Sequence, residues 1–71
     1  MDDVRTVGSE LPKEMARVRD VVIPQYESIG PSGSLAVGLM RLELDRAAAA
    51  MAEGDLTAMI RAYGALREFK S

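Results

Sequence analysis

Three observations predict that this chain is a small all-α protein built from three helices. Apolar residues recur every three or four positions along most of the sequence, which is the period of an amphipathic helix. The sequence shows neither the alternating runs typical of strands nor the turn dipeptides that join such runs. Gly-Pro at 30–31 and Gly-Asp at 54–55 divide the periodic region. We therefore expect helices at about 10–29, 33–53 and 55–69.

The first expected helix follows residues 1–8, which lack periodicity and are predicted to be a flexible tail before a single domain at 9–71. Ser9 can cap this helix, and Pro12 fits a first turn whose amides have no helical partners. The apolar stripe stays in phase across Pro24, which predicts one helix kinked at Pro24 rather than two separate helices. The stripe consists of Leu11, Met15, Val18, Val22, Tyr26 and Ile29.

The second expected helix can be capped by Ser32 or Ser34, ends at Gly54 and is apolar on two sides. One side contains Leu35, Leu39, Leu42 and Ala49. The opposite side contains Val37, Met40, Leu44, Ala47, Ala48 and Met51. A helix that is apolar on two sides is buried on two sides. We expect the first side to pack on the other helices and the second side to form an interface with another copy of the chain.

The third expected helix begins after Asp55, which can cap it and so form a tight hairpin with the second helix. Phe69 lies off the apolar stripe, so it is expected to contact a partner or the end of the first helix. The stripe itself consists of Leu56, Met59, Ile60, Tyr63 and Leu66.

The length and composition favour self-association. A chain of 71 residues buries only about 60% of its unfolded surface, so its core needs support. Cysteine is absent, which excludes disulfides, and histidine is absent, which argues against a zinc site. A homodimer is the remaining common solution.

Catalytic residues are not evident either. Without histidine or cysteine the chain lacks the usual general base and the best nucleophile. Glu43 and Asp45 are two positions apart on a helix and point in different directions. The glycines do not have the spacing of a phosphate-binding loop. We expect no enzyme activity, no cofactor and no metal.

The charge pattern argues against a nucleic-acid partner. The net charge is −2, and most basic residues have an acidic neighbour three or four positions away. Such pairs form local ion pairs rather than a basic face. The pairs expected are Glu14 with Arg17, Arg41 with Asp45, and Glu43 with Arg46. The alternative that we retain is a nucleic-acid-associated regulator, in which a dimer combines basic residues from two subunits.

The sequence also indicates a cytoplasmic bacterial protein. No apolar run approaches the ~20 residues that span a bilayer, so we expect no membrane partner. The acidic, polar N-terminus does not have the pattern of a secretory signal. Abundant alanine, and more arginine than lysine, are typical of GC-rich bacterial genomes.

Residues 54–66 resemble the second helix of a tetratricopeptide repeat. The matching positions are Gly54, Asp55, Leu56, Ile60 and Tyr63. Met59 and Leu66 stand where the repeat has packing alanines, and no second copy follows the 34-residue period. We expect a helical hairpin with the same capping chemistry. The order of LPKEMARVR, a Gly-Pro loop and AMAEGDLTAMIRAY resembles short uncharacterised bacterial helical proteins, a group that implies no activity.

Three residues are candidates for a binding surface: Arg46, Tyr26 and Phe69. Arg46 lies within the leucine-containing side of the second helix. Either its stem packs while its guanidinium reaches Glu43, or it marks the edge of a binding surface. Tyr26 either lines a groove beside Pro24 or packs over the loop. The sequence thus predicts a non-enzymatic protein-interaction module, a small adaptor or regulator, that acts as a homodimer or with another protein.

Overall fold

The computed structural model describes residues 2–70, with side chains from residue 6 onward. The described residues contain helices and no strand, so the predicted all-α fold is confirmed. The first helical rod is continuous and is followed by a 3₁₀ turn and two further helices. The elements are α1 (Asp2–Arg17), the π-helical η1 (Val18–Val22), α2 (Ile23–Glu27), the 3₁₀ turn η2 (Gly30–Gly33), α3 (Ser34–Glu53) and α4 (Leu56–Arg67).

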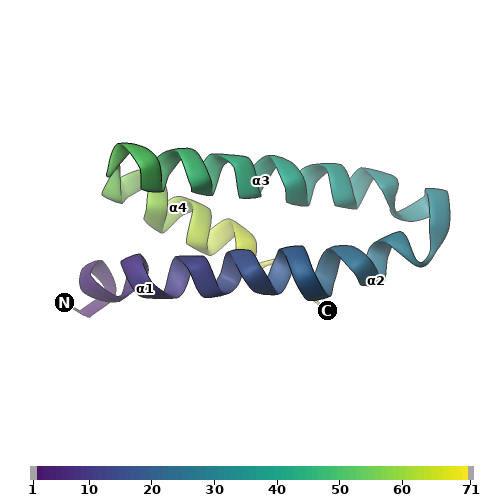
Figure 1. The fold of residues 1–71 in the computed structure, drawn as a ribbon, viewed down its shortest axis with the longest axis horizontal. Coiled ribbons are helices and arrows are strands. Elements are labelled where there is room, and N and C mark those ends of the chain that lie inside the picture. Colours follow the sequence, from purple (N-terminus) through teal and green to yellow (C-terminus); the bar gives the residue numbers. More distant parts are fainter. Residues whose placement is uncertain (1, 71) are drawn as a thin grey trace.

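The three helical segments form an elongated bundle of 40 × 19 × 15 Å. Figure 1 shows α1 and α2 in one line, α3 running back beside them, and α4 lying between α1 and α3. The last helix is short, so it covers only the half of the bundle near the N-terminus. At the other end, α2 and α3 face each other without a third helix. The first half of α3 therefore has fewer neighbours than the second.

The first helix begins earlier than predicted. It starts at Asp2, so residues 2–8 belong to α1 instead of preceding it, and the first residue lies outside the described residues. The reason is that Val7, only 4% exposed, lies one turn before the fully buried Leu11 and extends the apolar stripe. Ser9 is not a cap, because its hydroxyl donates a hydrogen bond to a carbonyl within α1.

The predicted continuity across Pro24 is confirmed, since the backbone remains right-handed helical through η1 into α2. The irregularity lies upstream of the proline. The Ile23 N–H donates to the carbonyl of Val18, five residues back, in a π-helical turn. A regular α-turn would press the Pro24 ring against the carbonyl of Asp20, and the wider turn provides room for it.

The η2 turn reverses the chain through two glycines with different roles. Gly30 has a φ of +79°, which confirms it as the left-handed end of the first rod. Gly33 is buried, and a Cβ atom there would overlap the carbonyl oxygen of Tyr26. Gly33 also occupies the cap position of α3, so the predicted caps Ser32 and Ser34 are wrong. The N-terminus of α3 consequently has no side-chain cap.

The α3–α4 hairpin has the predicted capping chemistry. Gly54 has a φ of +67°, and the Asp55 carboxylate accepts a 3.1 Å hydrogen bond from the Ala58 N–H. Ala47 is fully buried and Ala50 is 3% exposed, and these small side chains let α4 approach α3 closely. The main core cluster consists of Val7, Leu11, Val18, Val22, Ile23, Val37, Met40, Ala47, Ala62 and Leu66.

Candidate functional site

The structure reverses the predicted roles of the two sides of α3. Val37, Met40 and Ala47 were expected at a dimer interface, but they are 7%, 1% and 0% exposed and belong to the core of a single chain. Leu44 is half-buried against the same core. Of the six predicted interface residues, only Ala48 and Met51 are exposed. The prediction that this side forms an interface is therefore wrong for its central residues.

Charge is the signal that distinguishes the two sides. None of the residues that make up the buried side, from Val37 to Met51, is charged. The other side carries Arg46 at its centre and Glu53 at its end. A lone charge is costly in a core but ordinary on a surface. This difference is present in the sequence and favours the observed arrangement.

The exposed side of α3 forms a leucine face, defined here as Leu35, Leu39 and Leu42. These side chains are 77%, 49% and 43% exposed, respectively. They lie one helical turn apart on the half of α3 that α4 does not reach. Single exposed leucines are common on proteins, but three in one row on a chain of this size form a contiguous apolar patch.

Beyond the leucine face, the same side of α3 carries Arg46. Its Nη1 lies 3.3 Å from Oε2 of Glu43, so the predicted pair is confirmed, and the arginine side chain is 63% exposed. Arg46 also borders a hollow between α3 and α4 whose floor is formed by small side chains. The hollow is lined by Ala49, Ala50, Ala58, Ala62 and Ala65, with charged residues at its rim.

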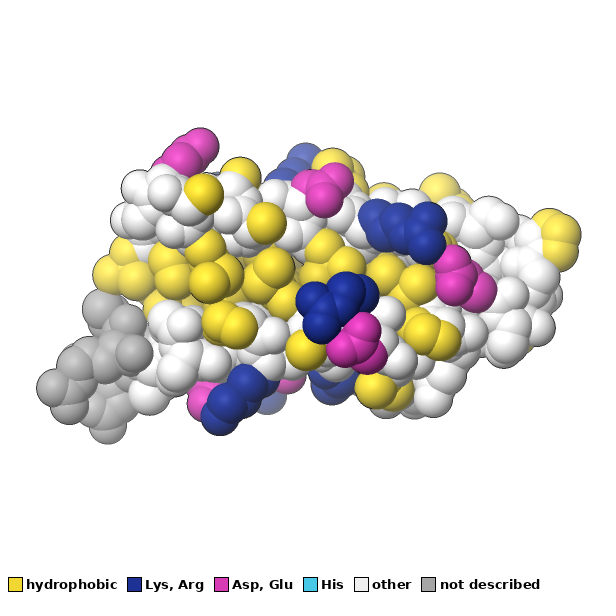
Figure 2. Space-filling view, in the orientation of Figure 1, with side chains coloured by type: hydrophobic (Ala, Val, Ile, Leu, Met, Phe, Trp, Pro, Cys, Tyr) yellow, Lys and Arg dark blue, Asp and Glu magenta, His cyan; other side chains and the backbone are white. Residues whose placement is uncertain are grey.

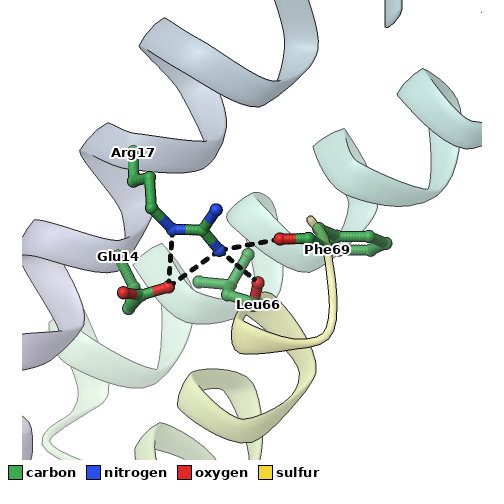
Figure 3. A network of polar contacts seen from close by, with 4 residues as sticks. All are labelled: Glu14, Arg17, Leu66 and Phe69. Atoms are coloured by element: carbon green, nitrogen blue, oxygen red, sulfur yellow. Dashed lines mark hydrogen bonds and ion pairs between the residues drawn. The ribbon is translucent and has the colours of Figure 1, made fainter. Parts of the chain in front are cut away.

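A polar network joins the ends of α1 and α4 (Figure 3). One guanidinium nitrogen of Arg17 donates to the carbonyls of Leu66 and Phe69, at 3.1 and 2.8 Å. The same arginine forms the predicted ion pair with Glu14, at 3.0 Å. Arg17 thereby binds the Phe69 carbonyl beyond the end of α4 and adds a second donor to the Leu66 carbonyl, which already accepts from the Phe69 N–H. The network joins the C-terminal end of α4 to α1.

We expect Arg17→Met to destabilise the fold by about 1–2 kcal/mol, because it removes two charge-assisted hydrogen bonds in a partly buried site. The matched control is Arg41→Met, which removes the exposed 2.8 Å ion pair with Glu27. That change should cost less than about 0.5 kcal/mol. Urea unfolding of both variants provides the comparison, and equal losses would contradict the structural role of Arg17.

Tyr26 and Phe69 contribute less to a surface than predicted. Both are half-buried and pack against the core. The carbonyl oxygen of Tyr26 lies next to Gly33 of the η2 turn, and its side chain packs against the core. Phe69 lies beside the end of α1, where its carbonyl binds Arg17. Of the three candidate surface residues, only Arg46 is mainly exposed.

Figure 2 shows an apolar band along the boundary between α3 and α1, with charged side chains at its edges. Arg41 binds Glu27 of α2 instead of the predicted Asp45. Arg19 forms a 2.9 Å ion pair with Asp20, and its hydrogen bonds hold the pKa of that carboxyl below the ordinary value. Leu35, Leu39 and Leu42 of the leucine face are the most exposed large apolar side chains of α3, ahead of Met51 at 37%.

Among the residues that the structure describes, no three acidic side chains are grouped so that they could hold a metal ion. Nor does any helix within residues 2–70 have the length and apolar character needed to cross a membrane. Comparison with protein-family models, curated proteins and solved structures finds no match to this chain.

Proposed function

We propose that this chain is a non-enzymatic protein-interaction module, a small adaptor or regulator, that acts as a homodimer through the leucine face. The observation that supports this most directly is the 77% exposure of Leu35 in a row with two further exposed leucines. Contiguous apolar surface of this kind is typical of sites that bind another protein. Packing the row against a second helix would remove it from water.

The expected association is weak. Complete burial of an exposed leucine contributes about 1.5–3 kcal/mol, and each of these side chains is already partly covered. Association also costs about 4 kcal/mol or more in lost translational and rotational freedom. A dimer held mainly by the leucine face should therefore dissociate at tens of micromolar or above.

We also propose a cytoplasmic, bacterial setting. The absence of cysteine and the preference for arginine and alanine support it. In such a setting the protein would work by holding or regulating another protein after dimerisation.

The nucleic-acid alternative has one observation in its favour. Arg17, Arg67 and Lys70 line a shallow hollow near the end of α4, together with Glu14. Arg17 is already bound to two carbonyls, however, and other basic residues are in ion pairs. A gel-shift assay at low salt discriminates the two proposals, because phosphate binding would weaken steeply as salt is added. We expect no shift at micromolar protein.

The proposed dimer is tested by Leu39→Asp, with Ile60→Asp as the matched control. Both positions are exposed in the single chain, at 49% and 43%, so both variants should stay folded. Ile60 lies on α4, away from the leucine face. In sedimentation velocity, Leu39→Asp should run as a monomer while Ile60→Asp keeps the wild-type dimer. Dimerisation of both variants would remove the leucine face from consideration.

A further inference from the structure

We infer that two copies of the chain pair through α3 in an antiparallel, two-fold arrangement, with the leucine face of each copy on the alanine-lined hollow of the other. This inference rests on the proposed homodimer and specifies its geometry. Three features of α3 support it: the spacing of its exposed residues, the difference between its two halves, and the distribution of charge along it.

The exposed side of α3 has the spacing of a helix-pairing seam. Its residues follow one another in alternating steps of four and three along nearly the whole helix: Leu35, Leu39, Leu42, Arg46, Ala49 and Glu53. This average of 3.5 residues keeps one stripe of a helix against a partner helix over several turns. The seam is exposed in the single chain, since each of its residues is accessible to water.

The two halves of this seam have complementary shapes. The first half carries large leucines where no third helix covers α3. The second half carries Ala49 beside the hollow, which Ala58 and Ala65 of α4 also line. A large side chain of one copy fits a site of small side chains in the other only if the two helices run in opposite directions. A parallel pair would place leucines on leucines and one alanine-lined hollow on the other.

The antiparallel register that overlaps the whole of α3 places Leu39 opposite Ala49 of the second copy. In the same register, Leu42 lies along the aliphatic stem of Arg46 of the second copy, and Leu35 lies near Glu53. The two-fold axis then passes close to the middle of α3. Each contact occurs twice, as a two-fold interface requires.

Charge complementarity also favours the antiparallel pair. The N-terminus of α3 has no side-chain cap and no acidic residue in its first turn, so its dipole favours an added negative charge. The proposed register brings Glu53 of the second copy to this end of the helix. A parallel pair would instead place Arg46 against Arg46 and Glu53 against Glu53, and like charges opposite one another oppose association.

The test uses the absence of cysteine from the chain. Two variants, Leu35→Cys and Glu53→Cys, each place one thiol on an exposed seam position. Each variant alone and an equal mixture are treated with a short thiol-to-thiol crosslinker, and mass spectrometry identifies the products. Light scattering on the wild-type chain and on the same untreated samples reports whether they contain dimers.

If the pair is antiparallel, the mixture should give a crosslinked product that contains one chain of each variant. This mixed product should be in severalfold excess over the crosslinked product that either variant forms with itself. A parallel pair would give the reverse, with Leu35→Cys crosslinking to itself, and this would overturn the inference while the homodimer stands. Dimers by light scattering without any crosslinked product would overturn it equally, because another face would then mediate pairing. Monomers in every sample, including wild type, would overturn both the inference and the proposed dimer.

Discussion

Met40→Asp is expected to unfold the chain. Met40 is 1% exposed and lies in the core formed by α3 with the other helices, where a carboxylate would have no partner. An unpaired buried charge costs more than about 4 kcal/mol, which is comparable with the total stability of a domain of this size. The far-UV circular dichroism of this variant should lose its helical signal at room temperature.

The neighbouring position provides the control. Leu39→Asp makes the same chemical change one residue away, on the exposed side of α3. It should retain the helical spectrum and a cooperative thermal transition, since its carboxylate stays in water. If Met40→Asp were folded and Leu39→Asp unfolded, the assignment of the two sides of α3 would be reversed.

Gly33→Ala is expected to produce the second largest effect. The added Cβ would overlap the backbone carbonyl of Tyr26 and come within 3.1 Å of the Ile29 side chain. The backbone has to move, because a carbonyl in the helical rod cannot rotate away as a flexible side chain can. Overpacking of this kind costs about 2–3 kcal/mol, which urea unfolding would report as a lower midpoint with an unchanged slope.

The matched control for this substitution is Gly64→Ala. Gly64 lies inside α4, and an added Cβ there has no neighbour within 4 Å. Alanine is the better helix former, so this variant should be more stable than wild type by about 0.5–1 kcal/mol. Opposite signs for the two variants are expected. A loss at Gly64 as large as that at Gly33 would mean that close packing is not the cause.

The number of helices and most of their boundaries followed from local chemistry. The glycines at 30 and 54 both have positive φ, and the cap by Asp55 is formed as expected. The stripe that stays in phase across Pro24 corresponds to one continuous rod as far as Tyr26, whereas Ile29 lies beyond α2 and is 58% exposed. The start of α1 was missed because Gly8 and Pro12 suggested a boundary, although Val7 continued the apolar stripe.

Features that depend on long-range packing could not be predicted in this way. Arg17 binds carbonyls 49 and 52 residues away, and the sequence contains other arginines that could occupy such a site. The buried side of α3 depends on where α4 lies, and periodicity alone describes both sides equally well. Arg46 and Glu53 were the local indication, because a core position would leave their charges without water.

The most direct test of the proposed self-association is the solution mass of the wild-type chain, measured by light scattering. The protein is diluted from hundreds of micromolar to about one micromolar, a range that spans the expected dissociation constant. The chain has a mass of 7.7 kDa. We expect close to twice this mass at the highest concentration and a fall toward the single-chain mass on dilution. The mass of a single chain at every concentration would contradict the homodimer and leave the leucine face open to a different protein.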